Sequence, residues 1–206
     1  MRGLGRQNCV ALHSIAMYDS RGGLLMTSLE QSTEQGAIRM AETQPQWADP
    51  TLAIMAEGWA AYQEQLINAL APLDAEQLEL RVAPGLRSIR EIATHIVSVR
   101  ANWFRGALGV GGDRLVEIGG WQEPDAPPRT AAELVAGLRE TWQAMRTAMA
   151  GWTPADLAET VEGEYHGDSF SLVRGWVIWH VIEHDTHHGG EISYALGINS
   201  LPGVDI

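Results

Sequence analysis

Residues 179–192 read Trp-His-Val-Ile-Glu-His-Asp-Thr-His-His-Gly-Gly-Glu-Ile and hold four of the chain's seven histidines. On a helix that turns by about 100° per residue, His184 and His188 lie about 40° apart. They share that face with the apolar side chains of Val181 and Ile192. The pattern therefore predicts a helix whose two histidines face the interior of a helical bundle.

Four long helices are predicted along the chain. The last runs from about Ser171 to Leu196, with Gly197 as its stop. The two middle helices follow capping boxes, in which a Ser or Thr precedes a Glu by three residues. Residues 159–170 alternate enough to favour a short β-hairpin. We therefore expect an all-α four-helix bundle. The other three helices are expected from Pro50 to Leu70, from Ser88 to Trp103 and from Thr130 to Gly151.

The chain is interpreted as one helical domain with an extension. The helical pattern occupies residues 50–206. Residues 1–49 mix Gly, Gln, Ser and Thr without sustained periodicity, and we interpret them as a loosely attached N-terminal extension. Residues 106–128 are rich in Gly and Pro, and we interpret them as the connection between the second and third helices.

Composition excludes several classes of partner. The 206 residues carry a net charge of −12 and no cluster of Lys or Arg, so neither nucleic acid nor an anionic membrane surface is an expected partner. No stretch approaches the roughly 20 apolar residues of a membrane span. Cys9 is the only cysteine, which excludes an internal disulfide and a thiolate-rich metal site. We expect a cytoplasmic protein that acts on a small molecule.

The histidine pair on the last helix is suited to metal binding. The spacing of His184 and His188 places two ring nitrogens one turn apart, as two neighbouring ligands of a transition metal require. A third ligand is expected from His95, which lies on the apolar stripe of the second helix, where an unpaired imidazole is unfavourable. Three neutral imidazoles suit Zn or Ni, and also Fe or Mn, and leave positions open for water or substrate.

The same pattern has a simpler interpretation, in which the three histidines are hydrogen-bonded residues of the core. Around them, His180, His187 and Glu191 lie on one flank of the histidine face and could orient the ligands or carry protons. Glu183 and Asp185 point further away, and we expect them on a solvated face.

Aromatic residues at helical spacing usually belong to a core, and a ligand pocket is the alternative. We expect the tryptophans of the helices in the core. They include Trp103, Trp142, Trp176 and Trp179.

The stretch from Trp179 to Ile192 resembles the C-terminal motif of the DinB/YfiT-like family of metalloenzymes. In that family a His-x-x-x-His run commonly continues as Arg-Gly-Gln, and a further histidine follows a Ser-x-x-Glu opening in the second helix. Ser88, Glu91 and His95 match this opening. The chain departs from the commoner motif at Gly189, where arginine is frequent, and at Glu191, where glutamine is frequent.

The resemblance covers about residues 50–200 and implies an up-down-down-up bundle, often a homodimer. It also implies one divalent metal held by the residues that match the family's ligands, His95, His184 and His188. Related bundles include mycothiol-dependent maleylpyruvate isomerase and bacterial thiol-S-transferases, in which the metal activates a low-molecular-weight thiol.

We therefore expect a metal-dependent transferase or isomerase that uses such a thiol, with Glu191 or His187 as the proton carrier. Two alternatives stay open. One is a metal-dependent hydrolase with the same three ligands. The other is a stress-induced, non-catalytic dimer in which the metal only ties the second helix to the fourth.

Overall fold

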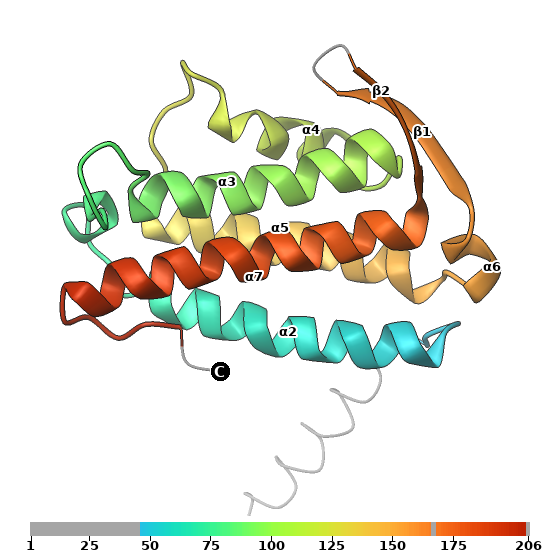
Figure 1. Cartoon of the computed structure of the whole chain (residues 1–206), viewed down its shortest axis with the longest axis horizontal. Helices are drawn as coiled ribbons and strands as arrows, with labels where there is room; N and C mark the ends of the chain where they lie inside the picture. The colour runs from blue at the N-terminus through green and yellow to red at the C-terminus, as the bar shows by residue number, and fades with distance from the viewer. Residues whose placement is uncertain (1–45, 166–167, 205–206) are drawn as a thin grey trace, which may run out of the picture. The chain divides into compact units, whose positions relative to one another are not determined.

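The computed structural model describes residues 46–165 and 168–204, and four long helices form its framework (Figure 1). Around the bundle, α2 packs on α5, α5 on α3, α3 on α7, and α7 on α2. Figure 1 shows α2 and α7 running in one direction and α3 and α5 in the other. The predicted all-α four-helix bundle with up-down-down-up topology is therefore confirmed. The four helices are α2 (Pro50–Leu70), α3 (Ile89–Asn102), α5 (Ala131–Ala150) and α7 (Arg174–Ile198).

The two middle helices, α3 and α5, begin at the caps that the sequence indicates. The Ser88 side chain accepts a hydrogen bond from the backbone N–H of Glu91, and the Glu91 carboxylate accepts one from the N–H of Ser88. Thr130 and Glu133 form the same reciprocal pair ahead of α5. Each pair satisfies backbone donors that the first helical turn leaves without partners.

The connection between α3 and α5 is more ordered than the sequence indicates. Because α3 and α5 run in the same direction, the chain must return along the bundle before α5 begins. A π-helical turn at Trp103–Ala107 is followed by helix α4 (Gly112–Gly119) and by a short 3₁₀ turn, η3 (Gly120–Gln122). Leu115 and Ile118 of α4 are buried, so apolar burial offsets the low helix propensity of its glycines.

The predicted hairpin is present, and it is longer than expected. Strands β1 (Thr160–Tyr165) and β2 (Asp168–Val173) pair antiparallel, with Thr160 opposite Val173. Pairing of β2 therefore continues through the first three positions assigned to the last helix, and the predicted helix start at Ser171 is wrong. Helix α7 also runs past Gly197 to Ile198, and the chain turns at Ser200, whose φ is 59°.

Most of the predicted extension lies outside the described residues. Its last four residues, 46–49, are described and contact the helices. Trp47 packs on the core, the N–H of Ala48 donates to the carbonyl of Ala150, and the Asp49 carboxylate accepts from the N–H of Leu52. In the described ranges no helix is long and apolar enough to cross a membrane.

The tryptophans divide between core and surface. Trp59 and Trp121 are buried, and Trp103 and Trp142 pack against the core. Trp176 and Trp179 are 44% and 56% exposed, so the expectation that these two are core residues is wrong. They lie on the outward side of α7, a side that apolar spacing along a single helix does not identify.

Two further short turns connect the longer elements. The residues after Asp74 form a 3₁₀ turn, η1 (Gln77–Glu79). The turn that Thr153 opens is the one-turn helix α6 (Pro154–Leu157), and its N-terminus is capped by Thr153 and Asp156. The η1 turn lies between α2 and α3 and adds the buried Leu78 to the core, whereas α6 lies between α5 and β1.

Candidate metal centre

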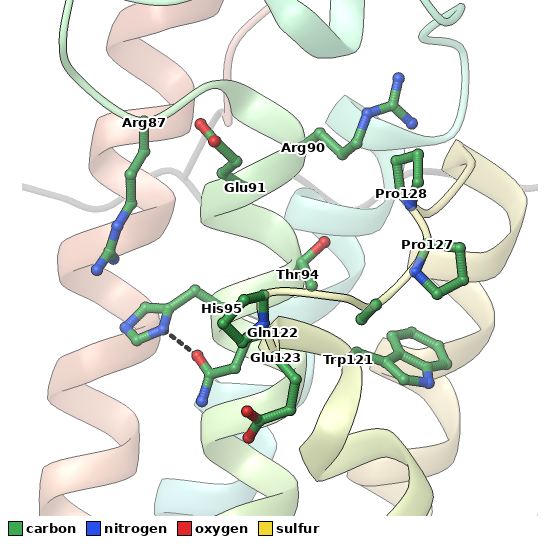
Figure 2. A pocket seen from close by; sticks show the side chains of 12 residues that line it. Arg87, Arg90, Glu91, Thr94, His95, Trp121, Gln122, Glu123, Pro127 and Pro128 are labelled. Carbon is green, nitrogen blue, oxygen red and sulfur yellow. Dashed lines mark hydrogen bonds between the residues drawn. The ribbon is translucent and has the colours of Figure 1, made fainter.

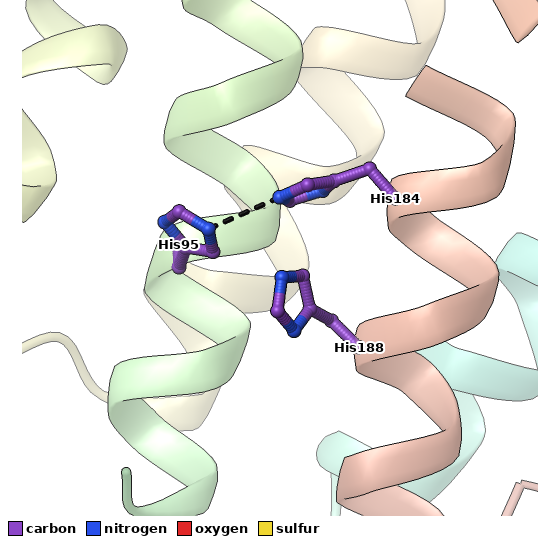
Figure 3. A group of neighbouring side chains, drawn as sticks. All are labelled: His95, His184 and His188. Atoms are coloured by element: carbon purple, nitrogen blue, oxygen red, sulfur yellow. Dashed lines mark hydrogen bonds between the residues drawn. The ribbon is translucent and has the colours of Figure 1, made fainter. Parts of the chain in front are cut away.

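Helices α3 and α7 bring three histidines together in the bundle (Figure 3). His95 projects from α3, and His184 and His188 project from successive turns of α7. The Nε2 atoms of His95 and His184 are 3.0 Å apart, and the ring centroid of His188 lies 4.9 Å from that of His95 and 4.4 Å from that of His184. All three side chains are half-buried.

Two of the three rings are oriented through their Nδ1 atoms. His95 Nδ1 lies 2.7 Å from the side-chain carbonyl oxygen of Gln122, and His188 Nδ1 lies 2.7 Å from a carboxylate oxygen of Glu191. Since both oxygens are acceptors, each Nδ1 carries the proton and donates it. The proton on Nδ1 leaves a lone pair on Nε2 in both rings, which is the tautomer that binds a metal through Nε2.

His184 is the most perturbed of the three. Burial, and to a lesser extent the neighbouring His188 and His95, lowers the pKa of His184 to about 3. Burial also lowers the pKa of His95. Both rings are therefore neutral near pH 7, the protonation state that a metal ligand requires. The Nδ1 of His184 is buried and has no hydrogen-bond partner among the described residues.

The donor set fits a divalent transition metal such as zinc. Bonds of 2.0–2.1 Å from a metal ion to two imidazole nitrogens place those nitrogens roughly 2.9 Å apart at a right angle and roughly 3.4 Å apart at the tetrahedral angle. The 3.0 Å separation of the His95 and His184 Nε2 atoms lies within this range. One donor atom from each of the three histidines can be chosen so that all lie within 4.8 Å of one another.

A second group, formed by His187, His188 and Glu191, satisfies the same distance criterion. It shares His188 with the first group, but the side chain of His187 is 65% exposed and that of Glu191 is 44% exposed. Because solvated ligands are less preorganised, the three-histidine group is the better candidate.

Behind the histidines lies a polar network that corrects one expectation. Asp185 is fully buried and forms an ion pair with Arg100, which is also fully buried. Its Oδ2 accepts from Arg100 Nε at 2.8 Å and from Trp59 Nε1 at 2.6 Å, while Arg100 Nη1 donates to Gln63 at 2.6 Å. Arg100 Nη2 is also 2.7 Å from Oδ2, and Oδ1 has no hydrogen-bond partner among the described residues. The expectation that Asp185 is solvated is wrong.

The remaining predicted residues lie around the histidines at different distances. Glu191 contacts His188 directly, and its second oxygen is 3.6 Å from His187 Nε2. His180 stacks on Trp176 with a centroid distance of 5.1 Å and lies 3.6 Å from Glu183, which is exposed as expected. Gln122 was not identified from the sequence, because it lies in the connection before α5, where no periodicity relates it to His95.

Comparisons with known proteins agree with this architecture. The family model of the DinB superfamily matches residues 59–192, which include all three histidines. The fold is similar to that of a DinB-like protein from Bacillus cereus ATCC 10987, with a TM-score of 0.58, 22% identity, and coverage of 73% of this chain and 93% of that chain.

It is also similar to a protein assigned to the DinB family from Exiguobacterium sibiricum 255-15. There the TM-score is 0.53, the identity is 19%, and the match covers 72% of this chain and 92% of that chain. A search of curated proteins found no match. At these identities the two structures support the fold, and the family model supports membership. The chain belongs to the DinB superfamily.

Proposed function

We propose that His95, His184 and His188 bind one divalent transition metal ion, zinc or nickel before iron or manganese, and that the protein is a metal-dependent enzyme acting on a small molecule. The observation that carries this proposal is that ring nitrogens without a proton converge, because the protons of His95 and His188 are on Nδ1. Gln122 and Glu191 hold the Nδ1 protons of His95 and His188, which leaves a lone pair on Nε2 of both rings. The His95 Nε2 lies 3.0 Å from that of His184, and donor atoms of all three histidines lie within 4.8 Å of one another.

Hydrogen bonding among the three histidines cannot account for this arrangement. A neutral imidazole carries one proton, so His184 Nε2 can donate to His95 or to His188 but not to both. One Nε2 lone pair is then left without a donor from the other two rings. A cation accepts all three lone pairs at once, which favours metal binding over the interpretation of hydrogen-bonded core histidines.

A bound metal would supply a Lewis acid that lowers the pKa of a coordinated water or thiol. The residues of the chain would then orient the ligands and move the proton. Gln122 and Glu191 keep the rings of His95 and His188 in the ligating tautomer. The Glu191 carboxylate also approaches the exposed His187 at 3.6 Å, so these two residues form a path for a proton between the metal site and solvent.

A cavity of about 420 Å³ borders His95, and this favours an enzyme over a purely structural metal site. That volume lies within the range of small-molecule sites. The thiol-dependent transferase or isomerase is our first reading, and the metal-dependent hydrolase shares its ligands. Turnover by zinc-loaded protein with and without added low-molecular-weight thiol separates them, and light scattering tests the expected homodimer.

Elemental analysis tests the ligand set. The full-length protein should hold one metal per chain, and His95→Ala, His184→Ala and His188→Ala should each abolish it. His187→Ala is the matched control, because this histidine lies on the same helix but belongs only to the alternative group. Retention of metal in His95→Ala together with its loss in His187→Ala would move the site to the exposed group.

A further inference from the structure

The cavity beside His95 has chemically distinct walls (Figure 2). One wall is apolar and includes Trp121, Pro127 and Pro128 from the connection before α5. The other wall is polar and includes Arg87, two residues before α3, and Arg90 and His95 on the first two turns of α3. A ligand that fits both walls has an apolar body and a polar or charged end.

Arg87 is the uncommitted cation of this cavity. The Arg90 guanidinium donates to Glu79 at 2.6 Å and to the backbone carbonyls of Ala75 and Arg129. The Glu91 carboxylate lies one turn along α3 from Arg87. It accepts hydrogen bonds from Arg81 at 2.6 Å and from the Ser88 N–H. Among the described residues no acidic group forms an ion pair with Arg87.

Arg87 also lies near the candidate metal centre. Figure 2 shows its side chain extending along α3 toward the imidazole of His95. The guanidinium is close enough for its charge to contribute to the lowered pKa of His95. Gln122, which orients His95 through its carbonyl oxygen, also lines the cavity, and its amide group offers further donors.

We propose that this cavity binds the carboxylate of a small organic acid through Arg87, with the acid's apolar body against Trp121 and Pro127. The inference rests on the proposed function, because it makes the acid the ligand presented to the metal centre. A guanidinium pairs with a carboxylate through two parallel N–H donors. A phosphate dianion fits less well, since Arg87 is the one cation of the cavity without an acidic partner among the described residues, and the carboxylate of Glu123 also lines the cavity.

The test is an NMR titration of the ¹⁵N-labelled full-length protein, metal-free and zinc-loaded. The reporter is the indole N–H signal of Trp121, assigned with Trp121→Phe. Hexanoate is the acid, hexanamide its neutral control and inorganic phosphate the competing anion. We expect hexanoate to shift the Trp121 signal and to bind more tightly than the other two. Equal binding of hexanamide, or tighter binding of phosphate, would overturn the proposal.

Variants assign the binding to Arg87. Arg87→Gln should weaken hexanoate binding by about tenfold or more, and Arg87→Lys by less, since a single ammonium replaces the guanidinium pair. Arg139→Gln is the matched control, because Arg139 is exposed and does not line the cavity. Equal hexanoate affinity in Arg87→Gln and Arg139→Gln would contradict the assignment.

A further probe separates the two sources of the acid. Tighter binding of 6-mercaptohexanoate than of hexanoate, only with zinc present, would identify the acid as the thiol cofactor, and equal binding would identify it as the other substrate. Metal content is measured on every sample. If Arg87→Gln binds hexanoate as tightly as the parent while each chain holds one metal, only this inference is refuted. If no metal binds at the histidines, the proposed function is refuted, and the metal-free titration still tests the role of Arg87.

Discussion

His184 and Asp185 are neighbours on α7, but their side chains enter opposite surroundings. Asp185 is fully buried and accepts hydrogen bonds from two side chains, Arg100 and Trp59, and Arg100 also donates to Gln63. His184 is half-buried and meets two rings of its own kind, His95 and His188. In the first cluster the charge of Asp185 is balanced by Arg100 of the same chain. The second cluster gathers ring-nitrogen lone pairs that the three histidines cannot all satisfy among themselves, an arrangement that suits a cation from outside.

This difference indicates a division of roles. The network of Asp185, Arg100, Trp59 and Gln63 joins α7 to α2 and α3, and it fixes the rotation of α7 about its axis. Because His184 is the adjacent residue, the same rotation points the histidines at α3. Changes to the network should therefore reduce stability, and changes to the histidines should reduce metal binding.

The largest expected effect is that of Asp185→Asn. It leaves the Arg100 guanidinium buried without a countercharge, which should lower the free energy of unfolding by about 3–5 kcal/mol. Urea denaturation of the metal-free protein measures this loss. The double variant Asp185→Leu with Arg100→Met removes both charges and should lose less than the single variant. A single variant within about 0.5 kcal/mol of the parent would show that the ion pair does not hold α7.

The next effect concerns the residues that orient the ligands. Gln122→Ala removes the acceptor of the His95 Nδ1 proton and should weaken zinc binding about tenfold to a hundredfold, with little change in stability. Competition with a chromophoric chelator gives the affinity. Gln143, exposed on α5 and outside the site, provides the control Gln143→Ala. Unchanged zinc affinity in Gln122→Ala would show that Gln122 does not orient His95 for metal binding.

Two adjacent glycines test how closely α7 approaches α2. A Cβ at Gly189 would lie 1.9 Å from the Tyr62 hydroxyl oxygen, whereas a Cβ at Gly190 would meet nothing within 4 Å. Gly189→Ala should therefore cost about 1–3 kcal/mol of stability, and Gly190→Ala should be neutral or stabilising by up to about 1 kcal/mol. Thermal denaturation compares the pair. Equal stabilities would mean that the helices can separate freely at this point.

The effect that is smallest near neutral pH is a pH dependence. The pKa of His184 is about 3 in the folded protein, against an ordinary value of 6.5. The unfolded chain therefore binds a proton first as pH falls below about 6.5, and metal-free stability should decline between that pH and about 3. The slope from this residue is less than about 1.4 kcal/mol per pH unit. His184→Ala should decline less steeply, and parallel curves would place the origin of the decline elsewhere.

The histidines could be predicted because their signal is local. Periodicity assigns His184 and His188 to the same face as Val181, and the capping box at Ser88 sets the start of the helix that carries His95. These features depend on residues a few positions apart. The family resemblance added the topology, which periodicity alone does not give.

The missed features depend on tertiary contacts. Asp185 is buried because Arg100, 85 positions away, supplies its countercharge. An arginine on the buried face of the α3 helix was a signal that a core carboxylate exists, but it does not identify which one. Gln122 and helix α4 lie in a glycine-rich connection, where burial of Leu115 and Ile118 decides the conformation more than propensity does.

The most direct test of the central claim is X-ray absorption at the zinc edge, which counts the imidazole ligands of zinc in the reconstituted full-length protein. We predict three imidazoles at about 2.0–2.1 Å in the parent and two or fewer, with zinc largely lost, in His184→Ala. A spectrum with the same imidazole count and zinc occupancy in His184→Ala would contradict the assignment of His95, His184 and His188 as the metal centre.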